Sequence, residues 1–121
     1  MKPLSCFHAH VYFDLHELEQ AIDLRREIGR RFEVPIGAVY DRPIGPHSKG
    51  MFQIVFGSED FGVIVPWLMQ HRGALDVLVH GDTGEHYIDH TQHVLWLGNS
   101  QRLYTEMFQR ANDNAAPLFA G

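Results

Sequence analysis

Residues 7–13, FHAHVYF, alternate between two kinds of side chain. Because successive side chains of a β-strand point to opposite faces, this alternation predicts a strand with one apolar face and one histidine-bearing face. The apolar face comprises Phe7, Ala9, Val11 and Phe13, and the other face comprises His8, His10 and Tyr12. We therefore expect a sheet that packs a core on one side and presents imidazoles on the other.

A helix is expected immediately after this strand. Asp14 and Glu17 are spaced as in a capping box, in which each side chain satisfies a backbone group at the helix start. Apolar side chains then recur at helical spacing to about Phe32. The stripe comprises Leu18, Ala21, Ile22, Ile28 and Phe32. These residues predict a helix over residues 14–32 that covers the apolar face of the sheet.

The remaining segments complete a β-α-β-β-α-β order, which is typical of the ferredoxin-like fold. Pro66 suits a first helical turn better than a helix interior, so the second helix is expected only from about residue 65. The sequence thus predicts an α+β fold with a four-stranded antiparallel sheet, both helices on one face and the other face uncovered. The expected segments are strands at 38–42, 51–56 and 75–80, a loop at 43–50, a turn at 58–62 and a helix at 65–71.

The C-terminal third is expected to add helix. A third helix is predicted within residues 85–97, a short helix at about 103–110 and a flexible tail at 112–121. A length of 121 residues suits one domain, since domains of about 100–150 residues are the commonest. Residues 1–121 are therefore predicted to form a single domain, with its motifs between about residues 7 and 98.

Composition argues against several classes of protein. Hydrophobic residues at 45% and charged residues at 21% are typical of a globular chain. The net charge of −5 argues against nonspecific nucleic-acid binding, and no apolar run reaches the ~20 residues of a membrane span. Cys6 is the only cysteine and cannot form an internal disulfide, and no secretory signal follows the N-terminus. A cytoplasmic location is therefore expected.

Histidine is over-represented, with nine residues among 121. In the expected sheet the last strand lies antiparallel beside the first, which places His80 near His8. The third strand is expected to run parallel to the first, which brings the loop that carries His47 to the same end. We therefore expect His8, His10, His47 and His80 to converge at one end of the uncovered sheet face.

Such a cluster predicts a metal site. Imidazole binds zinc, iron, copper and nickel, and three imidazoles leave coordination positions open on an ion. The plainer alternative is that the two histidines of one strand are simply solvated. His47 has an alternative of its own, since a histidine on a loop can bind substrate instead of metal.

The other histidines carry less information. Those expected at the surface are His16 and His71. His86, His90 and His93 are spaced by four and three residues, which places them either in an outer layer of the site or on an exposed helix face. Asp89 and His90 are a candidate orienting pair.

Three blocks of this sequence resemble the DOPA 4,5-dioxygenase family of small bacterial and fungal proteins. The blocks are HAHVYF at 8–13, RPIGPHSKGMFQIVF at 42–56 and LDVLVHGDTGEHYIDHTQHVLWLG at 75–98. Ser48 and Gly81 stand where proline is common in that family. The resemblance implies extradiol ring opening of a catechol, such as DOPA or a related aromatic. It also implies non-haem iron(II) as the cofactor, with zinc or nickel as alternatives in the purified protein.

This chemistry assigns roles to the clustered side chains. The predicted metal ligands are His10, His47 and His80. His8 is expected as a fourth ligand or as an acid–base residue, a role that His90 could also fill, and Tyr12 is expected to donate a hydrogen bond to an oxygen intermediate. Asp76 shares the sheet face but lies about four residues from His80, so three imidazoles are expected in place of two with a carboxylate.

Two other classes stay open on the sequence alone. Cofactor-free monooxygenases and isomerases also use ferredoxin-like dimers and need no histidine cluster, and a noncatalytic module would hold a metal with no open position. In the favoured interpretation the partners are a small catechol and dioxygen, without nucleic acid or membrane. The uncovered sheet face also favours a homodimer.

Overall fold

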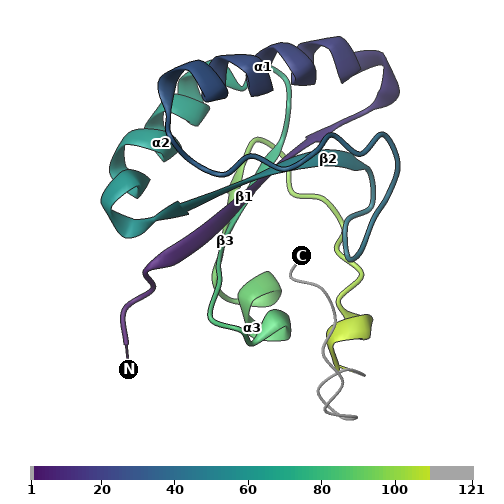
Figure 1. Cartoon of the computed structure of the whole chain (residues 1–121). Helices are drawn as coiled ribbons and strands as arrows, with labels where there is room; N and C mark the ends of the chain where they lie inside the picture. Colours follow the sequence, from purple (N-terminus) through teal and green to yellow (C-terminus); the bar gives the residue numbers. More distant parts are fainter. Residues whose placement is uncertain (1, 110–121) are drawn as a thin grey trace.

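A four-stranded sheet in the order β2-β1-β3-β4 organises the chain, and every neighbouring pair of strands is antiparallel (Figure 1). The computed structural model describes residues 2–109. Its strands are β1 (Cys6–Phe13), β2 (Gly50–Gly57), β3 (Val77–Gly81) and β4 (Val94–Leu97). Its helices are α1 (Leu18–Arg31), α2 (Ser58–His71) and α3 (His86–Thr91), and a 3-10 turn, η1 (Leu15–Glu17), precedes α1.

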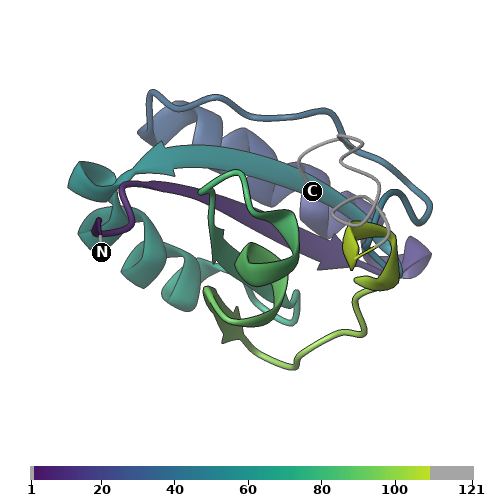
Figure 2. The same cartoon turned by 90° about the horizontal axis from the view of Figure 1, so that it is seen from below.

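The sheet separates two layers. Helices α1 and α2 lie on one face, and α3 with the chain that follows β4 lies on the other (Figures 1 and 2). The expected apolar faces of three strands are confirmed, because their alternate residues share one core with α1 and α2. The core residues that these three strands contribute are Ala9, Val11, Phe13, Phe52, Ile54, Phe56, Val77 and Val79. The polar face of β1 is therefore turned toward the layer of α3.

The α+β, ferredoxin-like arrangement is confirmed, but the strand predicted at 38–42 is wrong. That segment follows the edge of β2 through only two isolated bridges, Ile36 to Ile54 and Tyr40 to Met51. The two bridges are four residues apart on the 36–40 side but only three residues apart on β2, from 54 to 51. One extra residue on one side interrupts the ladder as a β-bulge does, so no continuous strand forms.

The first helix was predicted closely and the second was not. The Asp14 N–H donates to Glu17 Oε1 at 2.9 Å, as the capping box requires, although Ile22 of the expected stripe is 38% exposed. The prediction that α2 starts near residue 65 is wrong, because it begins at Ser58 and contains Pro66. Acidic residues in its first turn interact favourably with the helix N-terminus, which supports the earlier start.

The segment after β3 also differs from expectation. Residues 86–91 are helical as predicted, but Val94–Leu97 is a strand that pairs with β3 instead of continuing the helix. Four consecutive apolar residues suit a strand beside a buried neighbour as well as a helix, and sheet pairing decides between them. Near the end, residues 106–109 are helical. Residue 110 and the predicted tail at 112–121 lie outside the described residues.

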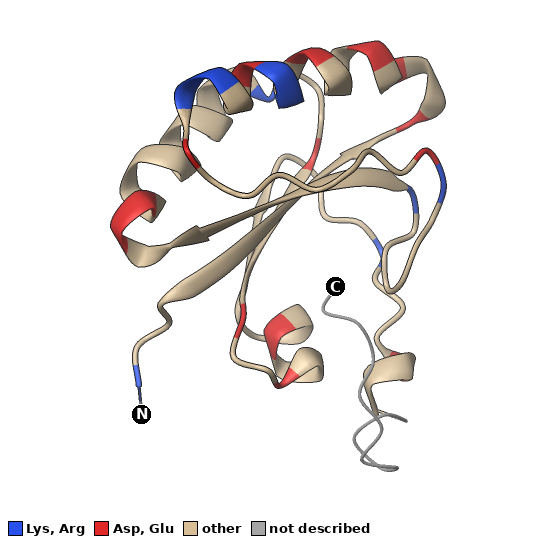
Figure 3. Ribbon diagram, in the orientation of Figure 1, with Lys and Arg blue, Asp and Glu red and all other residues tan. Residues whose placement is uncertain are grey.

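The outer side of α1 carries charges of both signs (Figure 3). Arg26 pairs with Asp23, and Arg30 and Arg31 both pair with Glu27. Exposed pairs of this kind contribute only about 0–1 kcal/mol each, so this side of the helix is a solvated surface. Among residues 2–109, no helix has both the length and the apolarity needed to cross a bilayer.

Candidate metal centre

The polar face of β1 is buried, and it carries the first members of a histidine cluster. His8, His10 and Tyr12 are 6%, 0% and 1% exposed. In the register between β1 and β3, His8 lies directly opposite His80. Because opposite residues of antiparallel strands share a face, these imidazoles meet. The ring centroids of His8 and His80 are 5.1 Å apart, and those of His10 and His80 are 5.0 Å apart.

His47 reaches the cluster from the opposite direction to that expected. The strand that follows its loop, β2, runs antiparallel to β1 and not parallel, so Gly50 lies opposite Phe13. The loop therefore arrives at the Tyr12 end of β1, where the Tyr12 hydroxyl and His47 Nδ1 are 2.7 Å apart. The His47 ring lies 4.2 Å from that of His10. The expectation that the four histidines gather at one end of the sheet face is therefore wrong. The cluster instead extends along β1.

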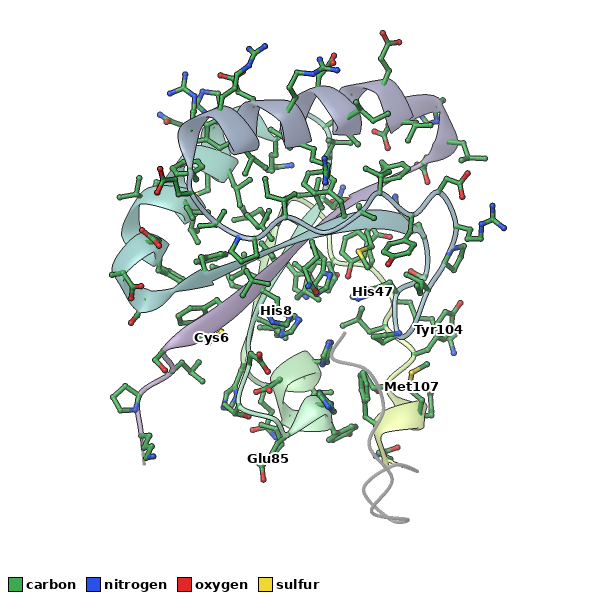
Figure 4. All side chains as sticks on the ribbon, in the orientation of Figure 1. Cys6, His8, His47, Glu85, Tyr104 and Met107 are labelled. Atoms are coloured by element: carbon green, nitrogen blue, oxygen red, sulfur yellow. The ribbon has the colours of Figure 1, made fainter. Side chains whose placement is uncertain are left out.

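The sheet face expected to be uncovered is covered. The ring of His90, from α3, lies 4.2 Å from that of His80, and the Phe108 ring lies 4.7 Å from that of His90. Figure 4 shows His8 and His47 between the sheet and this layer, with Glu85 toward the outside. His47, His80 and His90 are at most 3% exposed, which excludes the alternative of solvated histidines on an open sheet.

Each imidazole of β1 and β3 has one nitrogen occupied by a partner outside the cluster. His8 Nε2 lies 3.2 Å from Asp82 Oδ2, and His10 Nδ1 lies 3.5 Å from Met51 Sδ. His80 Nδ1 donates to the carbonyl oxygen of Gly81 at 2.8 Å. Ligand histidines almost always hold their second nitrogen in this way, which fixes the ring and its tautomer.

The ligand nitrogens of these three histidines lie close together. His8, His10 and His80 each offer one ligand nitrogen, and these three atoms lie within 4.8 Å of one another. His10 Nε2 and His80 Nε2 are 3.0 Å apart. Two nitrogens that bind one ion at ~2.1 Å and at a right angle lie ~3.0 Å apart, so this separation suits a metal as well as an N–H···N bond. The donor set therefore fits a divalent transition metal.

Two imidazole nitrogens of the cluster lack a hydrogen-bond partner among the described residues. Within the described residues, His8 Nδ1 and His47 Nε2 are buried without a hydrogen-bond partner. An orphaned buried nitrogen is costly unless something binds it. His8 is a member of the three-histidine group, whereas His47 lies beside that group and its Nδ1 contacts the Tyr12 hydroxyl.

Burial keeps two imidazoles of the cluster, His10 and His47, neutral. Burial lowers the pKa of His10 well below 6.5, and the neighbouring imidazoles lower it further. Burial, with His90 and His80, also lowers the pKa of His47 to about 3. Both rings therefore hold lone pairs at neutral pH, as metal ligands must. Burial raises the pKa of the Tyr12 hydroxyl, so Tyr12 remains a hydrogen-bond donor.

Other predicted residues have structural roles. The Asp76 carboxylate accepts hydrogen bonds from the Asn99 N–H at 2.8 Å and from Gln101 Nε2 at 2.7 Å, so it fixes the chain after β4. The Asp89 carboxylate binds His93 and Thr83 rather than His90, whose Nδ1 donates to a carbonyl of its own helix. The histidines on exposed helix surfaces are His16 and His71.

Sequence reasoning missed Asp82 and Met51. Asp82 follows His80 by two residues, a spacing that places both side chains on one side of an extended chain, but the sequence predicts the strand only as far as residue 80. Met51 lies opposite Tyr12 in the β1–β2 register, and no pattern in the sequence marked its sulfur as a partner of His10.

Comparison with known proteins matches residues 7–107 to the family described as the Dopa 4,5-dioxygenase family. The chain belongs to that family. A solved structure from Nostoc punctiforme PCC 73102, assigned as a dioxygenase, has a TM-score of 0.85 with 47% sequence identity. That match covers 90% of this chain and 94% of the Nostoc chain.

Two fungal proteins are similar in sequence to this member of the Dopa 4,5-dioxygenase family. A DOPA 4,5-dioxygenase from Amanita muscaria is 35% identical over 78% of this chain. An uncharacterized 21.2 kDa protein from Botryotinia fuckeliana is 34% identical over 93% of it. The matches span 45% of the Amanita enzyme and 68% of the Botryotinia protein. Together with the family match they support a dioxygenase, and so an oxidoreductase.

Proposed function

We propose that this chain is an iron(II)-dependent extradiol dioxygenase that opens the ring of a catechol, such as DOPA or a related aromatic. One observation carries the proposal: His8, His10 and His80 are buried together, each with one ring nitrogen occupied outside the group. Membership of the Dopa 4,5-dioxygenase family supports the class of reaction.

In this proposal the ion is held by His8, His10 and His80. The sequence predicted His10, His47 and His80 as ligands, with His8 as a fourth ligand or as an acid–base residue. That assignment stays a prediction that metal measurements will test. His47 differs from His8 in one respect: its Nδ1 faces a protonated hydroxyl, that of Tyr12. We therefore assign the His47–Tyr12 pair to hydrogen bonding with the oxygen atoms of bound substrate.

The reaction adds both atoms of dioxygen to the catechol and breaks one ring carbon–carbon bond beside the diol, so it consumes no external reductant. When bound, iron(II) supplies Lewis acidity toward the catechol oxygens and a template that orients the reactants. Three neutral imidazoles add no negative charge, so the site favours an anionic ligand such as a catecholate.

Proton transfer is assigned to His90. Its Nδ1 donates to the His86 carbonyl at 2.7 Å, which leaves Nε2 as the basic nitrogen. The ring lies beside that of His80, so it stands next to a proposed ligand without being one of the three. Such an imidazole takes a catechol hydroxyl proton and returns it later in the reaction. The burial of the ring by Phe108 keeps bulk water away from this transfer.

Anaerobic reconstitution with iron(II) tests the function. Catechols including DOPA are added, air is admitted, and the yellow ring-cleavage product is followed by its visible absorbance. We expect product from the iron-loaded chain and none from the metal-free chain. Variant H90A is expected to retain iron and lose turnover. Failure of every catechol in a broad panel, with iron bound, would indicate a noncatalytic metal-binding module. Activity of the metal-free chain would instead indicate a cofactor-free enzyme.

A further inference from the structure

Asp82 contacts the imidazole that stands at the edge of the cluster. Its Oδ2 lies 3.2 Å from His8 Nε2, and the side chains are 33% and 7% exposed. The pair therefore connects a partly exposed carboxylate to the buried histidine cluster. Neither the family resemblance nor the comparisons assign a role to this carboxylate.

The backbone holds Asp82 firmly in place beside β1. Its N–H donates to the Cys6 carbonyl at 2.9 Å, which continues the pairing of β1 with the chain just beyond β3. The preceding N–H, that of Gly81, donates to the carbonyl of His93 at 3.0 Å. The carboxylate thus projects from an ordered segment rather than from a free turn.

The chemistry of the pair determines the tautomer of His8. An ionised carboxylate has no hydrogen to donate, so His8 Nε2 must carry the hydrogen of this contact. His8 Nδ1 is then the nitrogen with a lone pair. Within residues 2–109 that atom is buried and has no hydrogen-bond partner. His8 supplies one ligand nitrogen to the group it forms with His10 and His80, and Nδ1 is the nitrogen that the Asp82 contact leaves unoccupied.

We propose that Asp82 is a positioning residue that holds His8 as its Nε2–H tautomer and thereby directs the Nδ1 lone pair to the ion shared with His10 and His80. The proposal rests on the metal site proposed above. It also supplies what a three-imidazole site lacks, because a carboxylate bonded to a ligand histidine makes that histidine more basic without occupying a coordination position.

Cys6, His8 and Asp82 form a competing group, since one ligand atom from each also lies within 4.8 Å of the others. An ion bound there would use Asp82 as a direct ligand together with the Cys6 thiolate. The two arrangements make opposite predictions for Cys6. Replacement of Cys6 weakens metal binding only if the ion occupies this competing group.

Cobalt(II) binding to the full chain, followed by its visible absorbance, tests the proposal. We expect D82A to weaken cobalt binding by about 10–100-fold, the usual effect of removing the partner of a ligand histidine. Variant C6S is expected to bind as the wild type does. The matched control is D41A, which removes an exposed carboxylate that pairs with the neighbouring Arg42 and contacts none of the three proposed ligands within the described residues.

A double-mutant cycle separates positioning from a general structural effect. Variant H8A should itself weaken binding, and D82A should add nothing in that background, because its effect acts through His8. An equal loss from D82A with and without His8 would overturn the proposal. So would wild-type affinity in D82A or in H8A, or a loss in C6S as large as that in D82A.

Imidazole nitrogen chemical shifts in the metal-free chain give a second measurement that does not depend on affinity. Wild-type His8 is expected as the Nε2–H tautomer, and D82A as a mixture of both tautomers. A wild-type Nδ1–H tautomer would refute the assignment. The proposal of the metal site is refuted only if H10A and H80A bind cobalt as the wild type does. That result differs from those that refute the role of Asp82.

Discussion

Each ring nitrogen of His80 has a close neighbour. Its Nδ1 donates to the Gly81 carbonyl, and its Nε2 lies 3.0 Å from His10 Nε2. The ring therefore has one orientation and one basic nitrogen, which points into the three-histidine group.

We expect H80A to lose tight binding of iron(II), because two imidazoles remain where the proposed site has three. Metal content after anaerobic reconstitution and desalting measures the loss. Variant H16A removes an exposed histidine and is expected to retain the full metal content. Retention of one iron per chain in H80A would exclude His80 as a ligand. Variant H47A, measured in the same way, distinguishes the two ligand sets. It should retain iron if the ligands are His8, His10 and His80, and lose iron if His47 is a ligand as the sequence predicted.

At this scale the sequence predicted which histidines meet but not how each is held. Alternation along β1 and β3 placed His8, His10 and His80 on one face, since side-chain direction in a strand follows from position alone. His47 was placed correctly in the cluster through an incorrect strand direction. The contacts of Asp82 and Met51 depend on strand register, and register depends on the whole sheet.

Helix α3 is fixed to the neighbouring loop by one buried carboxylate. Asp89 is 1% exposed and accepts hydrogen bonds from the Thr83 N–H, from the Thr83 hydroxyl and from His93 Nδ1. Burial raises the pKa of Asp89, but the hydrogen bonds from His93 and Thr83 outweigh it, and the pKa lies below its usual 3.8. The charged carboxylate therefore stabilises the position of the helix that carries His90.

Variant D89N is expected to lower the free energy of unfolding at pH 7 by about 1–3 kcal/mol, the range for buried hydrogen bonds to a charged group. The folded pKa lies below the unfolded one, so this stabilisation is full above about pH 4 and is lost as the pH falls through the folded pKa. Urea unfolding of the metal-free chain at several pH values measures it. The exposed control D23N is expected to change stability by less than about 0.5 kcal/mol. A deficit in D89N that persists unchanged at pH 3 would contradict this account.

Prediction of whole elements succeeded where residues alternate and failed where they do not. Strands β1, β2 and β3 carry a clear two-residue period, and η1 with α1 carries a capping box followed by a helical period. Val94–Leu97 is uniformly apolar, and a run of four such residues has no period that distinguishes strand from helix. The start predicted for α2 from Pro66 is too late, and the acidic residues at positions 59 and 60 favour the start at Ser58.

At the scale of the whole molecule, the edge of the sheet, and not an uncovered sheet face, favours a homodimer. The sheet face that was expected to need covering is covered by α3 and by residues 103–108 of the same chain. Among the described strands, β4 lies at the edge of the sheet and Leu95 on it is 42% exposed. An exposed apolar edge strand is a template for pairing with another chain.

We therefore expect two copies to associate through β4, which light scattering after size exclusion would show as twice the chain mass of 13.9 kDa. Variant L95K, which places a charge on this edge, is expected to give the single-chain mass while leaving the fold intact by circular dichroism. A single-chain mass for the wild type at micromolar concentration would refute the homodimer. A dimer that persists in L95K would place the interface elsewhere.

Strand β1 contributes to the core with one face and to the histidine cluster with the other. This arrangement affects how many folded molecules can have β1 in the wrong register. A shift of β1 by one residue against its neighbours would exchange the two faces. Ala9 and Val11 would then enter the cluster, and His8 and His10 would enter the apolar core without partners, at a cost of about 1–3 kcal/mol for each unpaired group. Such a chain loses its stability together with its site. A sample of this protein that unfolds cooperatively should therefore contain few molecules that are folded yet wrongly assembled.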